Sequence, residues 1–250
     1  MAAKAKVSPL SASLECGPIA CRHCGVYRLC LPLGLDRGDM SLLDSIVRRQ
    51  EVYKRGQVLF RPGDPFDYVY AIRSGSAKTY VSTRDGRVQV TGFHIPGELL
   101  GLSALASGKY TSEARALETT SVCKVSAERL QELARTIPAI QYELLKIMSE
   151  RIGQDEELML LLGRRSAEER LAEYLLSLSR RFASRNYSAT QFRLSMSRGD
   201  IGNYLGIAEE TVCRILSRFQ ESGLVTIARR QVSLNDLRRL GAIAHLDVAG

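Results

Sequence analysis

The sequence lacks tryptophan and long apolar runs, and it contains only three histidines among its 250 residues. An apolar stretch such as residues 158–163 is far shorter than the roughly 20 residues that a membrane-spanning helix needs. Residues 7–13 do not form the apolar centre of a signal peptide. The histidines, His23, His94 and His245, are scattered, and no glycine-rich phosphate loop is present. We therefore expect a cytoplasmic protein that is neither a membrane protein nor an enzyme.

The charge balance favours a negatively charged partner. The chain carries 35 Lys and Arg against 27 Asp and Glu, a formal net charge of +8. Such an excess favours nucleic acid first and an anionic membrane surface second. The proportions of hydrophobic residues, 45%, and charged residues, 25%, are those of an ordinary folded protein.

The first half of the chain changes character twice. Residues 1–34 comprise a small, polar stretch, interpreted as a flexible tail, and a cysteine-dense segment from residue 16 whose glycines and prolines break regular structure. Residues 52–125 then show short alternating runs separated by turn signals, which predict an antiparallel β-roll or barrel. We assign this β-roll domain to residues 35–137.

A long helix is predicted over residues 138–163. Pro138 is a suitable first residue, and apolar side chains such as Ile140, Leu144 and Ile147 recur at helical spacing. A stripe of this length after a compact β-domain favours pairing with a second copy of the chain. The alternative is a core helix within one chain.

The C-terminal part, residues 164–250, is predicted to be a winged helix-turn-helix. Ile201 and Leu205 provide the apolar face of a first helix, Gly206 permits a tight turn, and a second amphipathic helix follows. Two short apolar runs flanking residues 229–230 predict the hairpin that forms the wing.

The second helix of this motif carries a polar face. Glu210, Cys213, Arg214 and Ser217 share one side of it, and Glu209 in its first turn is a further candidate. A carboxylate can accept from cytosine and an arginine can donate twice to guanine, so this face could read a G·C pair in the major groove of DNA. The alternative is an exposed salt bridge on a solvated helix.

The cysteines form a C-x2-C-x5-C run at Cys21, Cys24 and Cys30. Three thiolates so close in sequence can converge on one metal centre, which needs a fourth ligand. The candidates are Cys16, His23 and Cys123. An iron-sulfur cluster suits this spacing better than zinc, and thiol redox switching is a third alternative.

The chain resembles the oxygen-sensing fumarate and nitrate reductase regulators (FNR), a branch of the cAMP receptor protein (CRP) superfamily. The resemblance extends from Cys16 to about Asp236. Besides the cysteine run it rests on separate matches in one order, at residues 70–75, 91–94, 117–119 with Cys123, 167–171 and 198–206.

The resemblance implies an α+β protein with an N-terminal β-roll of the cyclic-nucleotide-binding type (a jelly roll), a dimerisation helix and the winged helix-turn-helix. It also implies a homodimeric activator of anaerobic genes that contacts RNA polymerase. In such a protein a [4Fe-4S] cluster bound by Cys21, Cys24, Cys30 and Cys123 promotes dimerisation and binding to a palindrome like TTGAT-N4-ATCAA, and oxygen destroys the cluster.

Two departures from the superfamily pattern bear on its ligands. Cyclic-nucleotide-binding members carry an Arg-Ser pair that clamps the phosphate, whereas this chain has Tyr110 and Thr111, so we expect no response to cAMP. The family's E-x-x-S-R pattern for reading bases is E-x-x-C-R here, with Cys213 in place of serine. A thiol donates a weaker hydrogen bond than a hydroxyl, which affects the choice of base at that position.

The long helix suggests a switch. Asp155, Glu156 and Glu157 interrupt its apolar stripe, and Glu157 is the residue we expect to face its counterpart in a dimer. Like-charge repulsion would then keep the monomer and the cluster-free dimer close in free energy. Ordering residues 16–34 around a cluster would shift this equilibrium toward the dimer.

Overall fold

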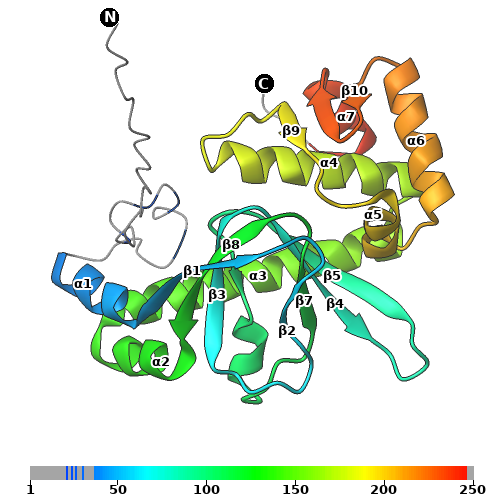
Figure 1. Ribbon diagram of the computed structural model, residues 1–250. Coiled ribbons are helices and arrows are strands. Elements are labelled where there is room, and N and C mark those ends of the chain that lie inside the picture. Colours follow the sequence, from blue (N-terminus) through cyan, green and yellow to red (C-terminus); the bar gives the residue numbers. More distant parts are fainter. Residues whose placement is uncertain (1–20, 22–23, 25, 27–29, 31–36, 247–250) are drawn as a thin grey trace, which may run out of the picture.

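The structure is a computed structural model that describes residues 21, 24, 26, 30 and 37–246 (Figure 1). The expected flexible tail and most of the cysteine-dense segment, with Cys16 and His23, lie outside the described residues. In the described part of the chain, no helix combines the length and the apolar character needed to cross a membrane.

The first half of the described chain is a β-roll made of two four-stranded antiparallel sheets. One sheet has the strand order β1-β8-β3-β6 and the other β2-β7-β4-β5. A helix, α1 (Arg37–Ile46), precedes the roll. The strands are β1 (Val47–Tyr53), β2 (Val58–Phe60), β3 (Tyr68–Ser74), β4 (Ala77–Ser82), β5 (Val88–His94), β6 (Leu99–Leu100), β7 (Glu113–Ala116) and β8 (Thr120–Ser126).

An aromatic cluster fills the interior of the roll. The rings of Phe60 and Tyr110 stack with their centroids 4.0 Å apart, and the Tyr70 ring lies 5.4 Å from that of Phe60. The turn between β3 and β4 requires glycine, because Gly75 has φ +79° and a Cβ there would lie 2.5 Å from the Thr119 carbonyl oxygen.

Two helices connect the roll to the C-terminal domain. α2 (Ala127–Thr136) begins at Ser126, whose hydroxyl accepts from the Arg129 amide. α3 (Pro138–Arg164) starts with proline, as expected, and Figure 1 shows it passing behind the roll from α2 toward α5.

The C-terminal domain begins with α4 (Ala167–Ala183). Ser166 and Glu169 form a capping box at the start of this helix. The remaining elements are β9 (Gln191–Arg193), α5 (Arg198–Leu205), α6 (Glu209–Glu221), β10 (Val225–Ala228), β11 (Gln231–Leu234) and α7 (Leu237–Ile243). The predicted wing is confirmed as β10 and β11, and β9 pairs with β11 to complete a three-stranded sheet. Neither β9 nor α7 was predicted.

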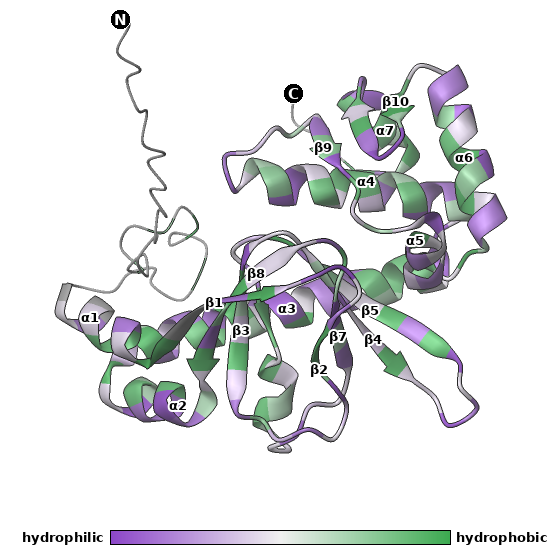
Figure 2. Ribbon diagram, viewed as in Figure 1, coloured by the Kyte–Doolittle hydropathy of each residue, from purple (hydrophilic) through white to green (hydrophobic). Residues whose placement is uncertain are grey.

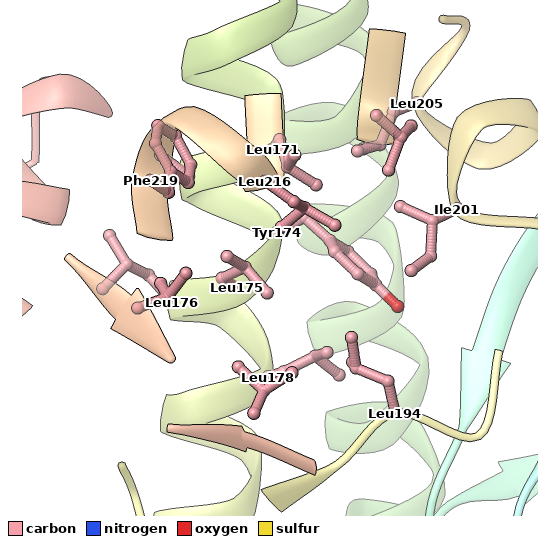
Figure 3. Close-up of a cluster of buried hydrophobic side chains, with 14 of the residues drawn as sticks. Leu171, Tyr174, Leu175, Leu176, Leu178, Leu194, Ile201, Leu205, Leu216 and Phe219 are labelled. Atoms are coloured by element: carbon pink, nitrogen blue, oxygen red, sulfur yellow. The ribbon is translucent and has the colours of Figure 1, made fainter. Parts of the chain in front are cut away.

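The hydrophobic core of this domain is built around α4. Figure 3 shows its leucines and Tyr174 packed among residues of α5 and α6, such as Ile201, Leu205 and Phe219. The same cluster includes Val90 and Phe93 of β5, so the core continues across the contact with the roll. The expected α+β fold is confirmed.

Candidate nucleic-acid interface and thiol site

The turn between α5 and α6 depends on two glycines. Gly206 has φ +64°, a left-handed conformation that ends α5. Gly202 lies so close to the turn that a Cβ there would be 2.6 Å from the Ile207 carbonyl oxygen. Ser197 and Asp200 form a capping box at the start of α5. These residues fix the relative placement of the two helices.

α6 is amphipathic, as predicted, and hydrophilic and hydrophobic residues alternate along it in Figure 2. Its apolar side is buried, and the predicted reading face, Glu210, Cys213, Arg214 and Ser217, is exposed. The Ser217 hydroxyl donates to the Cys213 carbonyl 3.1 Å away. Within the described residues Glu210 and Arg214 form no ion pair, so the structure does not show the salt bridge of the alternative reading.

Glu209 differs from the other residues of this face. One of its carboxylate oxygens would lie 2.8 Å from a Cβ placed on Gly199, near the start of α5. The Glu209 side chain is therefore directed back along the helix-turn-helix toward α5.

Polar contacts dock α5 onto β5, an edge strand of the roll. The Asn203 side chain pairs with this edge like a neighbouring strand: its amide nitrogen donates to the Val88 carbonyl at 2.7 Å, and its oxygen accepts from the Val90 amide at 2.5 Å. Lys78 of β4 forms an ion pair with Asp200 of α5 at 2.5 Å. Sequence reasoning did not identify these contacts.

A second link joins α4 to the roll. The Glu98 carboxylate accepts from Arg181 at 2.7 and 3.0 Å and from Arg185 at 2.8 Å. Burial opposes ionisation of Glu98, but the charge and hydrogen bonds of Arg181, together with the charge of Arg185, hold its pKa below the ordinary value. The neighbouring His94 is buried, and this burial lowers its pKa to about 3.

Glu98 and His94 line a cavity of about 500 Å³ between the roll and α3. Arg151 of α3 also lines it, donating to the Thr91 carbonyl at 3.1 Å and pairing with Asp155 at 3.0 Å. Tyr110 is buried, with its hydroxyl bonded to the Tyr68 carbonyl at 2.5 Å. In this cavity the carboxylate of Glu98 and the guanidinium group of Arg151 are each bonded to other groups of the same chain.

The contacts of the predicted cysteine ligands connect Cys21 to α1 and put Cys30 and Cys123 on the same side of the roll. Cys24 donates its amide to the Cys21 carbonyl at 3.0 Å, and the Cys21 amide donates to Asp44 of α1 at 2.8 Å. Cys30 packs against a hydrophobic cluster that includes Val125 of β8. Cys123 is two residues from Val125 on the same strand, so both side chains project from the same face of the sheet.

The described residues do not show these thiols assembled as a metal site. No group of three or more His, Cys, Asp or Glu side chains able to hold a metal ion is found among them. The structure brings Cys21 and Cys24 into one turn and places Cys30 and Cys123 on the same side of the sheet, without gathering all four. As a donor set, four thiols fit an iron-sulfur cluster.

α3 has two different apolar faces. Ile140 is only 1% exposed and belongs to the core of its own chain, so its assignment to a subunit contact is corrected. Leu144 and Ile147 are partly buried against the same cluster. A second set is strongly exposed, and of its members sequence reasoning placed only Ile152 in the apolar stripe: Tyr142, Leu145, Ile152, Met159 and Leu160.

The chain is similar to known proteins along most of its length. Residues 50–136 match the family model of the cyclic nucleotide-binding domain, and residues 169–243 match that of the Crp-like helix-turn-helix domain. The transcriptional activator protein Anr of Pseudomonas aeruginosa is 49% identical over 224 residues, which cover 90% of this chain and 92% of that protein. The fumarate and nitrate reduction regulatory protein of Escherichia coli is 42% identical over 226 residues, covering 90% of each chain.

A solved structure supports the same assignment. FixK2 from Bradyrhizobium japonicum superposes with a TM-score of 0.71 at 34% identity, covering 80% of this chain and 98% of that one. These relatives confirm the predicted kind of protein, a regulator and not an enzyme. The chain belongs to the family of Anr and the fumarate and nitrate reduction regulatory protein, and it is a transcription regulator with a helix-turn-helix DNA-binding domain.

Proposed function

We propose that this protein is an oxygen-responsive, cytoplasmic regulator of anaerobic gene expression. A [4Fe-4S] cluster held by Cys21, Cys24, Cys30 and Cys123 promotes homodimerisation and binding to a palindrome like TTGAT-N4-ATCAA. One observation carries the proposal. Cys30 packs against the hydrophobic cluster of buried side chains that contains Val125, and the Cys123 side chain projects from the same face of β8 as that of Val125. Cys30 therefore lies on the side of the roll from which the Cys123 side chain projects.

The chemistry of the donor set supports iron and sulfide as the bound group. Thiolates are the ligands of iron-sulfur clusters, and a cluster supplies a covalent link that oxygen can break. The protein itself contributes the anchoring of the segment: the Cys21 amide bonds to Asp44, and Cys30 is held against the apolar end of the roll. These contacts support a site formed by the N-terminal cysteines on this side of the roll.

Anaerobic purification followed by iron, sulfide and visible absorbance measurements tests the cluster. We expect about four iron and four sulfide per chain in the wild type. Cys123→Ser should lose iron, whereas the matched control Cys213→Ser, which removes an exposed thiol on α6, should keep it. Zinc in place of iron would refute the cluster and favour a zinc- or thiol-based regulator of the same fold, and equal iron contents in both variants would refute Cys123 as a ligand.

The exposed face of α3 supports a second copy of the chain as its partner. Leu145, Ile152 and Met159 follow one another at intervals of seven residues, the spacing of paired helices, and each is more than half exposed. Burying this stripe against its counterpart would remove a large apolar surface from water. Leu144 and Ile147 flank the contact from the core side.

An acidic residue on this face would oppose pairing. Glu157 is exposed, in keeping with its proposed role as the switch residue. Glu156 is also exposed, and it lies four residues after Ile152 and three before Met159, within the stripe itself. Glu156 is therefore a second candidate that sequence reasoning did not select.

Sedimentation of cluster-free protein distinguishes the two residues. Glu157→Ala should give dimers without a cluster if Glu157 faces its counterpart, and Glu156→Ala should do so if the exposed stripe is the contact. Relief of one repulsive pair is expected to change the dimer dissociation constant about tenfold. If both variants remain monomeric, charge repulsion on this helix does not control pairing.

The exposed face of α6 supports base reading by Glu210 and Arg214, with Ser217 and Cys213 beside them. Glu209, in the first turn of α6 with its side chain directed toward α5, is a further candidate for contact with DNA. Site selection from a randomised library tests this face: Cys213→Ser should sharpen selection at one base pair of each half-site. Unchanged selection would mean that the thiol does not contact a base.

Two further proposals concern partners. RNA polymerase would contact the hairpin between β4 and β5, where Arg87 and Asp85 form an exposed ion pair at 2.6 Å. A cyclic nucleotide would find no arginine at Tyr110 or Thr111, and Glu98 is already bonded to Arg181 and Arg185. Calorimetry that detects saturable cAMP binding would overturn the second proposal.

A further inference from the structure

Arg170 lies in the first turn of α4, at the joint between α3 and the DNA-binding domain. Its guanidinium group donates three hydrogen bonds, all to backbone carbonyls. One goes to Leu162 in the last turn of α3 at 2.7 Å, one to Arg165 between α3 and α4 at 3.0 Å, and one to Leu205 at the end of α5 at 3.0 Å. A single side chain thus connects the long helix to the first helix of the helix-turn-helix.

Two of the acceptors, the carbonyls of Leu162 and Leu205, are groups that helices leave unpaired. The last carbonyls of a helix have no partner within it and carry partial negative charge, which a nearby cation stabilises. At the end of α5, the amides of Gly206 and Ile207 return to Asn203 and Gly202. The Leu205 carbonyl is instead bonded to Arg170, which therefore caps the C-termini of two helices at once.

We propose that Arg170 is a positioning residue for operator recognition. By fixing α5 to the end of α3 it also fixes α6, because the tight turn at Gly206, which passes close to Gly202, joins the two helices. In a dimer formed through α3, Arg170 then determines the distance and angle between the two recognition helices, and so the spacer length that the protein prefers. This inference rests on the dimeric function proposed above.

Lysine cannot replace arginine in this role. A guanidinium group presents several donors in a planar fork, whereas an ammonium group is a point charge that cannot span three separated carbonyls. Arg170→Lys retains the net charge and with it the general attraction to DNA phosphates. Other contacts hold the domain together in this variant, since Asn203 and Asp200 still bind the roll.

Arg180→Lys is the matched control. Arg180 lies on the same helix, and its ion pair with Glu173, at 2.8 Å, stays within α4. The substitution makes the same chemical change without touching the joint.

Hydrogen exchange of anaerobically purified protein tests the joint without DNA. Arg170→Lys should speed exchange in peptides from the end of α3 and from the turn between α5 and α6 together, and leave the wing unchanged. Arg180→Lys should change neither. Exchange that is unaltered at both places, or accelerated throughout the C-terminal domain, would overturn the positioning role.

Operators with altered spacers test the consequence for recognition. We expect Arg170→Lys to bind a single half-site within about twofold of the wild type, to bind the best palindrome about tenfold more weakly, and to discriminate less between spacer lengths. Equal losses on half-site and palindrome, or an unchanged spacer preference, would overturn the proposal. If the wild type itself gains nothing from a second half-site, the dimeric function fails, and the exchange experiment still decides whether Arg170 holds the joint.

Discussion

Replacing Glu98 with glutamine removes the negative charge that joins the β-roll to α4. One carboxylate oxygen accepts from Arg181 and Arg185, and the other accepts from Arg181 and from the Ile95 amide. The Glu98 side chain is 21% exposed and that of Arg185 only 9%. Glutamine keeps the size of the side chain but offers a single acceptor oxygen, so two guanidinium groups are left side by side without a countercharge.

The size of the effect follows from what remains after the substitution. Removing one partner of a buried ion pair typically costs about 3–5 kcal/mol. Arg181 keeps its bond to the Phe93 carbonyl and Arg185 keeps its bond to the Pro96 carbonyl, which favours the lower end of this range. We expect a loss of about 3 kcal/mol in the free energy of unfolding, or roughly 6–12 °C in Tm for a chain of this size.

The contribution of Glu98 to the free energy of unfolding depends on pH, and the direction follows from its pKa. The pKa of Glu98 is lower in the folded protein than its ordinary value of 4.5. Its stabilising effect is therefore fully present above about pH 4.5 and is lost as the pH falls through the lowered folded-state pKa. The difference in stability between wild type and Glu98→Gln should be constant near neutrality and should shrink only in more acidic solution.

Urea denaturation of both proteins from pH 7 downward measures this difference. Glu132→Gln is the control, because its ion pair with Arg129 is exposed and its loss should cost at most about 1 kcal/mol. The reasoning is refuted if Glu98→Gln is as stable as the wild type at pH 7, or if the difference persists unchanged at the lowest pH at which both proteins fold.

Two further substitutions test the buried histidine and the helix-turn-helix. Burial lowers the pKa of His94 to about 3, so below about pH 6.5 the unfolded chain takes up a proton at this residue and the folded chain does not. The free energy of unfolding therefore decreases as the pH is lowered. His94→Gln should reduce that fall between pH 7 and 5 in urea titrations, and identical slopes would contradict it. Gly202→Ala should weaken operator binding at least about tenfold, because its Cβ would meet the Ile207 carbonyl oxygen at 2.6 Å. Gly163→Ala in α3 is its control, since nothing lies within 4 Å of a Cβ there, and equal affinities of the two variants in an anisotropy titration would disprove the steric argument.

Local patterns in the sequence were sufficient for most of the fold. Alternation predicts the strands of the roll, Pro138 marks the start of α3, and the two apolar runs give the wing. β9 was missed because three residues form a strand only through pairing with β11. α7 was missed because its seven residues are stabilised by packing against α4, a contact that no local period reveals.

The candidate site was predictable where one helix carries it. The exposed face of α6 follows directly from helical periodicity. On α3, periodicity indicates apolar side chains but not which of them contact the core of the same chain, so Ile140 was assigned to the wrong side. The bonds of Asn203 to β5 join residues more than a hundred positions apart, and such side chain to backbone pairs have no signature in the sequence.

Two sets of contacts hold α5, and from them we expect the effects of Arg170 and Asn203 on DNA binding to be coupled. Arg170 ties its end to α3, and Asn203 ties its side to β5, which Arg151 of α3 also contacts through the Thr91 carbonyl. Either tie alone keeps α5 near its position, so the two should be coupled.

A double-mutant cycle tests this coupling. If both ties hold the same position, Arg170→Lys combined with Asn203→Ala should weaken binding to the palindrome by more than the product of the two separate effects, while half-site binding changes little. Effects on the free energy of binding that add within about 0.5 kcal/mol would show independent contacts. In that case a displacement of α3 could reach α6 through Arg170 without involving the roll.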